Sequence, residues 1–92
     1  MEQNVLDDQP TRVKTRFELA AARMAERFVS DGRVAISLGE LDLAREFLEH
    51  HGCKFESLGA GKYRLVNRFG RAEEVSREGA FLAAFRRLAG RE

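Results

Sequence analysis

Apolar residues in the first third of the chain recur every three or four positions, which is the spacing of one face of a helix. They are Val13, Phe17, Ala20, Ala21, Met24 and Phe28. Charged residues fill most of the positions between them. Asp7, Asp8 and Pro10 are typical of a helix start, and Asp31 followed by Gly32 is typical of a helix end. The pattern therefore predicts a helix that starts within 7–10 and ends at Asp31 and Gly32.

The next segments predict a short strand and a second helix. The strand is expected over 33–37, where apolar residues alternate with polar or small ones. Ser37 followed by Glu40 is a capping-box pattern, so a helix is expected to begin at Ser37 and to end at Gly52. Its apolar stripe consists of Leu38, Leu41, Ala44, Phe47 and Leu48.

From Cys53 onward the apolar pattern has a period of two, which predicts strands. Strands are expected over 53–58, 62–68 and 71–75, joined by a turn at Gly59–Gly61 and by another at Phe69–Gly70. Ser76 can then cap a final helix. The expected buried stripe of that helix is Phe81, Leu82, Phe85, Leu88 and Ala89.

The order helix, strand, helix, three strands, helix predicts an α+β fold. We expect three helices packed on one face of a small antiparallel sheet of three to four strands. A chain of 92 residues fits one such domain. Residues 1–9 are acidic and are expected to form a flexible N-terminus, and residues 10–92 are expected to form the single domain.

The charge balance excludes a global electrostatic attraction to nucleic acid or to an anionic membrane. Lys and Arg number 16 and Asp and Glu 15, so the net charge is +1. Arg outnumbers Lys by 13 to 3, which with abundant Ala and Gly indicates GC-rich, bacterial-type coding, although a guanidinium also suits phosphate recognition. The N-terminal residues do not have the pattern of a signal peptide. The longest apolar run has six residues, whereas a membrane span needs ~20. A lone Cys53 suits a reducing compartment. We expect a cytoplasmic protein.

A phosphate-binding loop is excluded by spacing. Gly59, Gly61 and Lys62 share its residue types, but such a loop needs a further Gly upstream and Ser or Thr after the Lys. Glu56 and Tyr63 occupy those two positions, and a strand rather than a helix is expected to follow.

Other catalytic and metal-binding patterns also fail. His50, His51 and Cys53 are the one cluster of soft metal ligands, but zinc needs three or four ligands that converge, and adjacent histidines on a helix point about 100° apart. A metal shared across a dimer interface stays open as an alternative. Cys53 lacks a third group that would orient a histidine base, and Glu73 and Glu74 face opposite sides of a strand. We predict no metal, no cofactor, no catalytic residue and no enzymatic activity.

The strand region carries a basic face. Its candidate phosphate or nucleic-acid contacts are Lys54, Lys62, Arg64, Arg68 and Arg71. We expect Lys62, Arg64 and Arg68 to share one face, with Glu56 and Glu73 as the acidic counterweight. The alternative is a solvated sheet face with cross-strand ion pairs.

The first helix is the second candidate surface. Its partner-binding or homodimer residues are expected to be Val13, Phe17, Ala20, Met24 and Phe28, which are spaced as in helix pairs. The alternative is that this helix packs on the sheet and pairs electrostatically with the second helix, because the two helices carry net charges of opposite sign.

The predicted function is a small non-catalytic cytoplasmic module that binds another protein, or itself as a homodimer, in a regulatory, adaptor or inhibitory role. The alternative is a nucleic-acid-binding protein that uses the basic face of the strands. A third class is a subunit that is stable only inside a larger complex. No membrane partner is expected.

Overall fold

The computed structural model describes residues 10–33 and 35–90, which form three helices and a three-stranded antiparallel sheet. The elements are α2 (Pro10–Asp31), α3 (Leu38–His50), β1 (Lys54–Gly59), β2 (Lys62–Val66), β3 (Ala72–Ser76) and α4 (Arg77–Leu88). The predicted α+β class is confirmed, with the order α-α-β-β-β-α and three strands in the sheet order β1-β2-β3.

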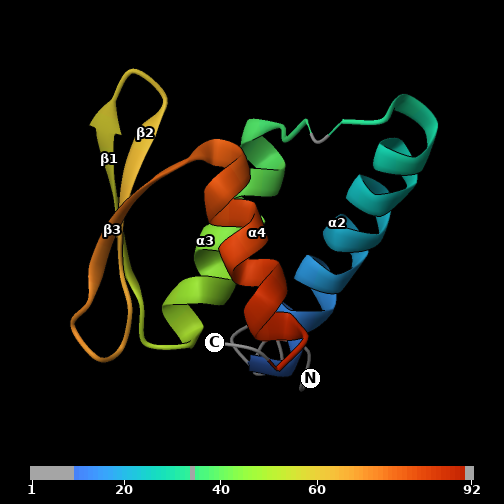
Figure 1. Ribbon diagram of the computed structural model, residues 1–92. Coiled ribbons are helices and arrows are strands. Elements are labelled where there is room, and N and C mark those ends of the chain that lie inside the picture. Colours follow the sequence, from blue (N-terminus) through green and yellow to red (C-terminus); the bar gives the residue numbers. More distant parts are fainter. Residues whose placement is uncertain (1–9, 34, 91–92) are drawn as a thin grey trace.

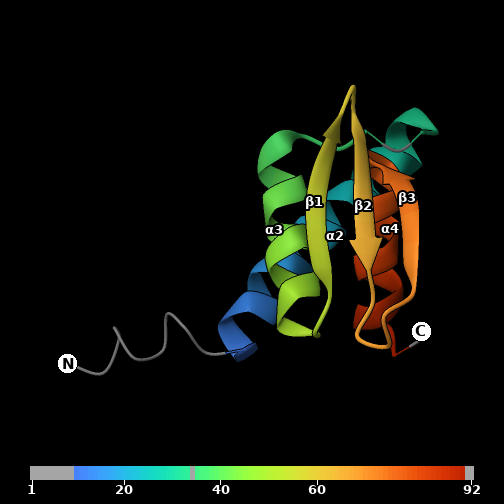
Figure 2. The ribbon, with the colours of Figure 1, turned by 90° about the vertical axis from the view of Figure 1, so that its left-hand side faces the viewer.

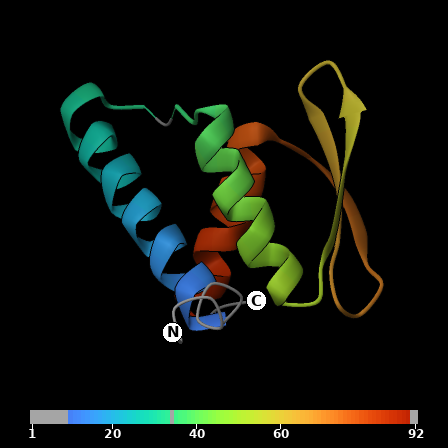
Figure 3. The same cartoon turned by 180° about the vertical axis from the view of Figure 1, so that it is seen from behind.

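The elements lie in three layers (Figure 1). The sheet is one layer, α3 and α4 form the middle layer, and α2 packs on the side of α3 and α4 that faces away from the sheet, as Figure 3 shows from behind. The expectation that the first helix packs on the sheet is therefore wrong. Of the described helices, only α3 and α4 cover the sheet, and they cover one face of it, so no described helix lies on the other face (Figure 2).

Two serines start the middle-layer helices, as predicted. The Ser37 hydroxyl accepts a hydrogen bond from the Glu40 amide at 3.2 Å, and the Glu40 carboxylate accepts one from the Ser37 amide at 2.9 Å. The Ser76 hydroxyl accepts one from the Gly79 amide at 3.0 Å. Each cap satisfies amides that have no partner inside the helix.

The strand expected over 33–37 is not formed by the described residues of that segment, and Val34 lies outside them. Two arginine side chains, in place of a neighbouring strand, donate hydrogen bonds to backbone carbonyls there. Arg27 donates to the Ala35 carbonyl at 2.7 Å, and Arg77 donates to the Ile36 carbonyl at 3.0 Å. Ile36 is nevertheless buried, which explains its apolar character.

The buried face of α4 differs from the expected stripe. Phe81 is fully buried, but Leu82 and Phe85 are 41% and 39% exposed. The helix instead buries the small residues Ala80, Ala83 and Ala84. Small side chains let α4 approach its neighbours closely, and a Cβ at Gly79 would lie 3.3 Å from the Val75 Cβ. The apolar run over 80–85 has no polar gaps, so its periodicity could not show which face turns inward.

The sheet is a meander joined by two tight turns. The backbone at Gly59, Ala60 and Gly61 has φ values of +88°, +55° and +74°, so the predicted hairpin turn is confirmed. Glycine at two of these positions avoids the steric cost of the left-handed region. The second strand was expected to continue to residue 68, but it ends at Val66 because the next turn begins at Asn67.

Three phenylalanines form the centre of the core where the helices meet. The Phe17 ring lies 4.9 Å from that of Phe47 and 5.0 Å from that of Phe81, centroid to centroid. Leu48 and Leu65 are also fully buried, and Leu65 brings the sheet into the same core. Burial of this apolar surface is the main favourable term in folding.

Candidate functional site

The apolar stripe predicted as a partner or dimer surface is mostly core. Val13, Phe17, Ala20 and Met24 are at most 6% exposed, because they pack against α3 and α4. Phe28 alone stays accessible, at 49%. The stripe therefore does not offer a partner a continuous apolar surface in this fold.

The expected electrostatic pairing of the first two helices is present. Arg16 lies 2.7 Å from the Glu46 carboxylate, and Arg27 lies 2.8 Å from the Glu40 carboxylate. The Arg16–Glu46 pair is about two-fifths exposed on both sides, so it contributes little to stability. The Glu40 side chain is only 14% exposed and is held more tightly.

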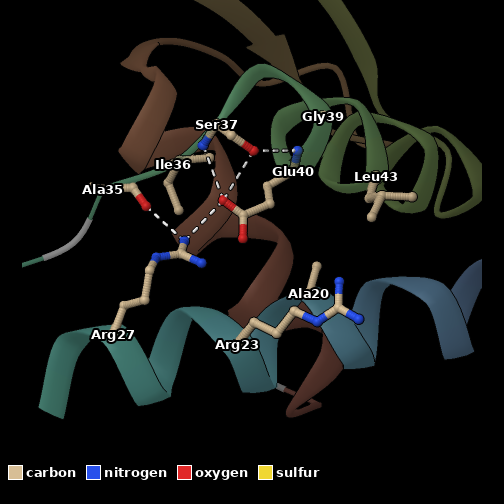
Figure 4. Close-up of a pocket in the computed structure, with 9 residues that line it drawn as sticks. All are labelled: Ala20, Arg23, Arg27, Ala35, Ile36, Ser37, Gly39, Glu40 and Leu43. Carbon is tan, nitrogen blue, oxygen red and sulfur yellow. Dashed lines mark hydrogen bonds and ion pairs between the residues drawn. The ribbon is translucent and has the colours of Figure 1, made fainter. Parts of the chain in front are cut away.

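An open groove of about 800 Å³ lies between the second half of α2 and the start of α3 (Figure 4). Ala20, Ile36 and Leu43 supply apolar groups to it. Arg23 from α2 and Glu40 from α3 are among its polar lining residues. The groove thus combines an apolar base with charged groups on both sides.

Glu40 has a structural task within the groove. Burial raises the pKa of its carboxyl, but hydrogen bonds from Arg27 and Ser37 and the positive charge of Arg27 outweigh burial, so the pKa lies below its ordinary value. The dashed lines in Figure 4 show this carboxylate joining α2 to the cap of α3. Glu40 is therefore a fixed negative charge at neutral pH.

Arg23 differs from Arg27, the other arginine of the groove. Among the described residues it makes no hydrogen bond or ion pair, whereas Arg27 makes both. Figure 4 shows its guanidinium next to Ala20, on the Leu43 side of the groove. A guanidinium beside apolar side chains is available to pair with a carboxylate of a partner.

The outer face of the sheet mixes charges of both signs. Arg64 lies opposite Glu56 on β1 and opposite Glu74 on β3. Lys62, two residues along on the same face, has its amine 3.4 Å from the Glu74 carboxylate. Glu73 was expected as the counterweight, but the register places it opposite Leu65, on the side of the sheet that faces the helices.

The other three predicted cations lie at one end of the sheet. Lys54 begins β1, and Arg68 and Arg71 lie in the turn between β2 and β3, outside the strands. The expectation that Arg68 shares a strand face with Lys62 is therefore wrong. The ring of Phe69, beside the Arg68 guanidinium, is 74% exposed.

The histidine and cysteine cluster lies where α3 joins β1. Cys53 is 5% exposed, and the His51 ring packs on that of Phe47 at 4.5 Å. No group of three or more His, Cys, Asp and Glu residues in 10–33 and 35–90 is placed to hold a metal ion.

Sequence reasoning missed the groove and the exposed phenylalanine. The groove depends on how α2 crosses α3, which no local pattern encodes. Phe69 carried a signal, since an aromatic residue before Gly70 in a turn has no neighbouring strand residue to bury it.

Comparison of the chain with protein-family models, curated proteins and solved structures found no match. Within the described residues, no helix has the length and apolar character needed to cross a membrane.

Proposed function

We propose that the protein is a non-catalytic module that binds a segment of another protein in the groove between α2 and α3. The observation that carries this proposal is the pairing of an apolar base with Arg23, a cation that has no partner among the described residues. A partner segment that presents an apolar side chain next to an acidic one satisfies both parts of the groove.

The shape of the groove supports a polypeptide over a small molecule. Small-molecule sites are usually enclosed and bury most of the ligand surface, whereas this groove is open along two elements. An amphipathic helix or an extended segment can lie in such a groove and keep its other face in water.

A non-catalytic role is supported by the chemistry of the groove. The low pKa of Glu40 leaves this carboxyl without a proton to donate at neutral pH, and its oxygens are engaged by Arg27 and Ser37. The thiol of Cys53 is buried away from the groove. A regulatory, adaptor or inhibitory role is one that binding of a partner protein alone can perform.

A cytoplasmic location and a capacity to self-associate belong to the same proposal. One cysteine in 92 residues suits a reducing compartment. A second copy of the chain also offers acidic and apolar residues, for example on α3. Sedimentation equilibrium of the wild-type protein and of Arg23→Glu tests this: a dimer that Arg23→Glu weakens would identify the partner in the groove as this chain itself.

The test is selection of peptides from a random displayed library on the immobilised full chain. Selected peptides are expected to combine Asp or Glu with Leu, Ile or Phe. Arg23→Glu should weaken their binding about tenfold, a change of ~1.4 kcal/mol. Lys14→Glu reverses an exposed charge outside the groove on the same helix and should change affinity by less than about twofold.

The proposal fails if no peptide is selected, or if the selected peptides bind Arg23→Glu as tightly as the wild type. Circular dichroism of each variant confirms that the fold is kept. Both substituted positions are exposed, so neither change removes core contacts.

A further inference from the structure

The end of the sheet next to the α3–β1 turn gathers positive charge around an exposed aromatic ring. We call this surface the sheet end and define it by Lys54, Arg68, Phe69 and Arg71. Arg68 packs against the α3–β1 turn, where a Cβ at Gly52 would lie 3.0 Å from the Arg68 Cβ. Two turns distant in sequence therefore contribute to one surface.

Phe69 is held outward by a well-bonded turn. The Asn67 side-chain oxygen accepts hydrogen bonds from the amides of Phe69 and Arg71, both at 2.9 Å. The Asn67 amide donates to the Arg71 carbonyl at 2.9 Å, which closes the turn. A single exposed apolar residue is ordinary on a protein surface. Here the ring also has a guanidinium over it, with the Arg68 Cζ 4.9 Å from the ring centroid.

The cations of the sheet end differ from those on the open sheet face. Lys62 and Arg64 lie beside Glu74, as described above. The side chains of Lys54 and Arg71 form no ion pair or hydrogen bond with any described residue. Their charge is therefore available to an anionic partner.

We infer that the sheet end binds single-stranded nucleic acid, with Lys54 and Arg71 at phosphates and the Phe69 ring stacked on a base. The cations attract the phosphate backbone, and an exposed ring offers a base a stacking surface that does not depend on sequence. Bases in a duplex are already stacked on one another, so they leave no face for Phe69. This contact is independent of the groove between α2 and α3.

An anionic membrane is the less suitable partner for the same residues. Stable attachment to a bilayer needs an apolar face of several residues or a lipid chain, and a single ring buries too little apolar surface. In the sheet end, Phe69 is the one large apolar residue.

The test is fluorescence anisotropy of a labelled twelve-nucleotide oligo-dT and oligo-U, titrated with the full-length chain. With two phosphate contacts, from Lys54 and Arg71, affinity should fall about sevenfold between about 50 and 200 mM salt, since each contact on a single strand contributes about 0.7 to the slope. Phe69→Ala should weaken binding at least about fivefold at both salt concentrations, because stacking does not depend on charge. Phe69→Tyr should keep the wild-type affinity, because a tyrosine ring also stacks on a base.

Charge reversal supplies a matched control on the same sheet. Arg71→Glu should weaken binding at least about tenfold at the lower salt concentration and make it less dependent on salt. Lys62→Glu makes the same change in charge at the opposite end of β2 and should leave affinity within about twofold.

Three results would overturn the inference. One is the absence of oligonucleotide binding at about 50 mM salt, where phosphate contacts are strongest. Another is an equal loss of affinity in Lys62→Glu and Arg71→Glu, which would point to net charge alone. The third is Phe69-dependent binding to vesicles of phosphatidylglycerol and phosphatidylcholine without binding to either oligonucleotide, which would assign the surface to a membrane.

Discussion

Replacement of Phe17 by Ala is the most direct perturbation of the three-layer arrangement. Phe17 is completely buried and contacts both Phe47 on α3 and Phe81 on α4. Removing a buried phenylalanine ring costs about 3–5 kcal/mol. Two aromatic pairs are lost together, so we expect a value in the upper half of that range.

The expected loss is large compared with the stability of the whole domain. A chain of 92 residues has a typical free energy of unfolding of about 5–14 kcal/mol. Phe17→Ala should therefore remove about a third or more of it. For a domain of this size, a loss of ~4 kcal/mol lowers Tm by roughly 15–30 °C.

The assay is urea unfolding followed by far-ultraviolet circular dichroism, because the sequence has no Trp to report by fluorescence. Leu19→Ala is the matched control: it shortens a large apolar residue on the same helix that is 56% exposed, and it should change stability by less than about 0.5 kcal/mol. A Phe17→Ala loss below about 1.5 kcal/mol, or an equal loss in Leu19→Ala, would refute the docking of α2 through its Phe17 face.

Two further substitutions test features of the groove and of the α3–β1 turn. The lowered pKa of Glu40 means that its carboxylate stabilises the fold above the ordinary pKa and that this stabilisation is lost as the pH falls through the lower, folded-state value. Glu40→Gln should therefore flatten the dependence of the unfolding free energy on pH between about 6 and 3. An unchanged profile would show that Arg27 does not hold the carboxylate. Gly52→Ala should destabilise the protein more than Gly32→Ala in the same urea assay. Both residues have positive φ, but of the two only a Cβ at Gly52 meets another atom, the Arg68 Cβ at 3.0 Å. Equal losses would contradict the close approach of the two turns.

Elements whose signals are local were predictable from the sequence. The capping pair Ser37 and Glu40 and the hairpin turn at Gly59–Gly61 depend on residues a few positions apart, and both are found as expected. The segment 33–37 had only five residues of alternating pattern. The carbonyls of Ala35 and Ile36 accept hydrogen bonds from Arg27 and Arg77, the latter about 40 positions away. No local pattern could show that.

The binding surfaces were harder to predict because they depend on register and on packing angles. Glu73 was expected beside the basic face, but the register places Glu74 opposite Arg64 and Glu73 opposite Leu65, because neighbouring residues of a strand lie on opposite sides of the sheet. Likewise, the apolar stripe of the first helix was predicted as a partner or dimer surface, and sequence alone could not show that α3 and α4 of the same chain cover most of it.

The position of α4 in the chain has a consequence for synthesis on the ribosome. The β1–β2 hairpin joins strands that are neighbours in sequence, so it can form as soon as both have emerged. Phe81 follows Phe47 by about 34 residues, which at 5–20 residues per second takes roughly 2–7 s. During that interval the Phe17 ring lacks its contact with Phe81, and the nascent chain exposes the surface that Phe81 later covers.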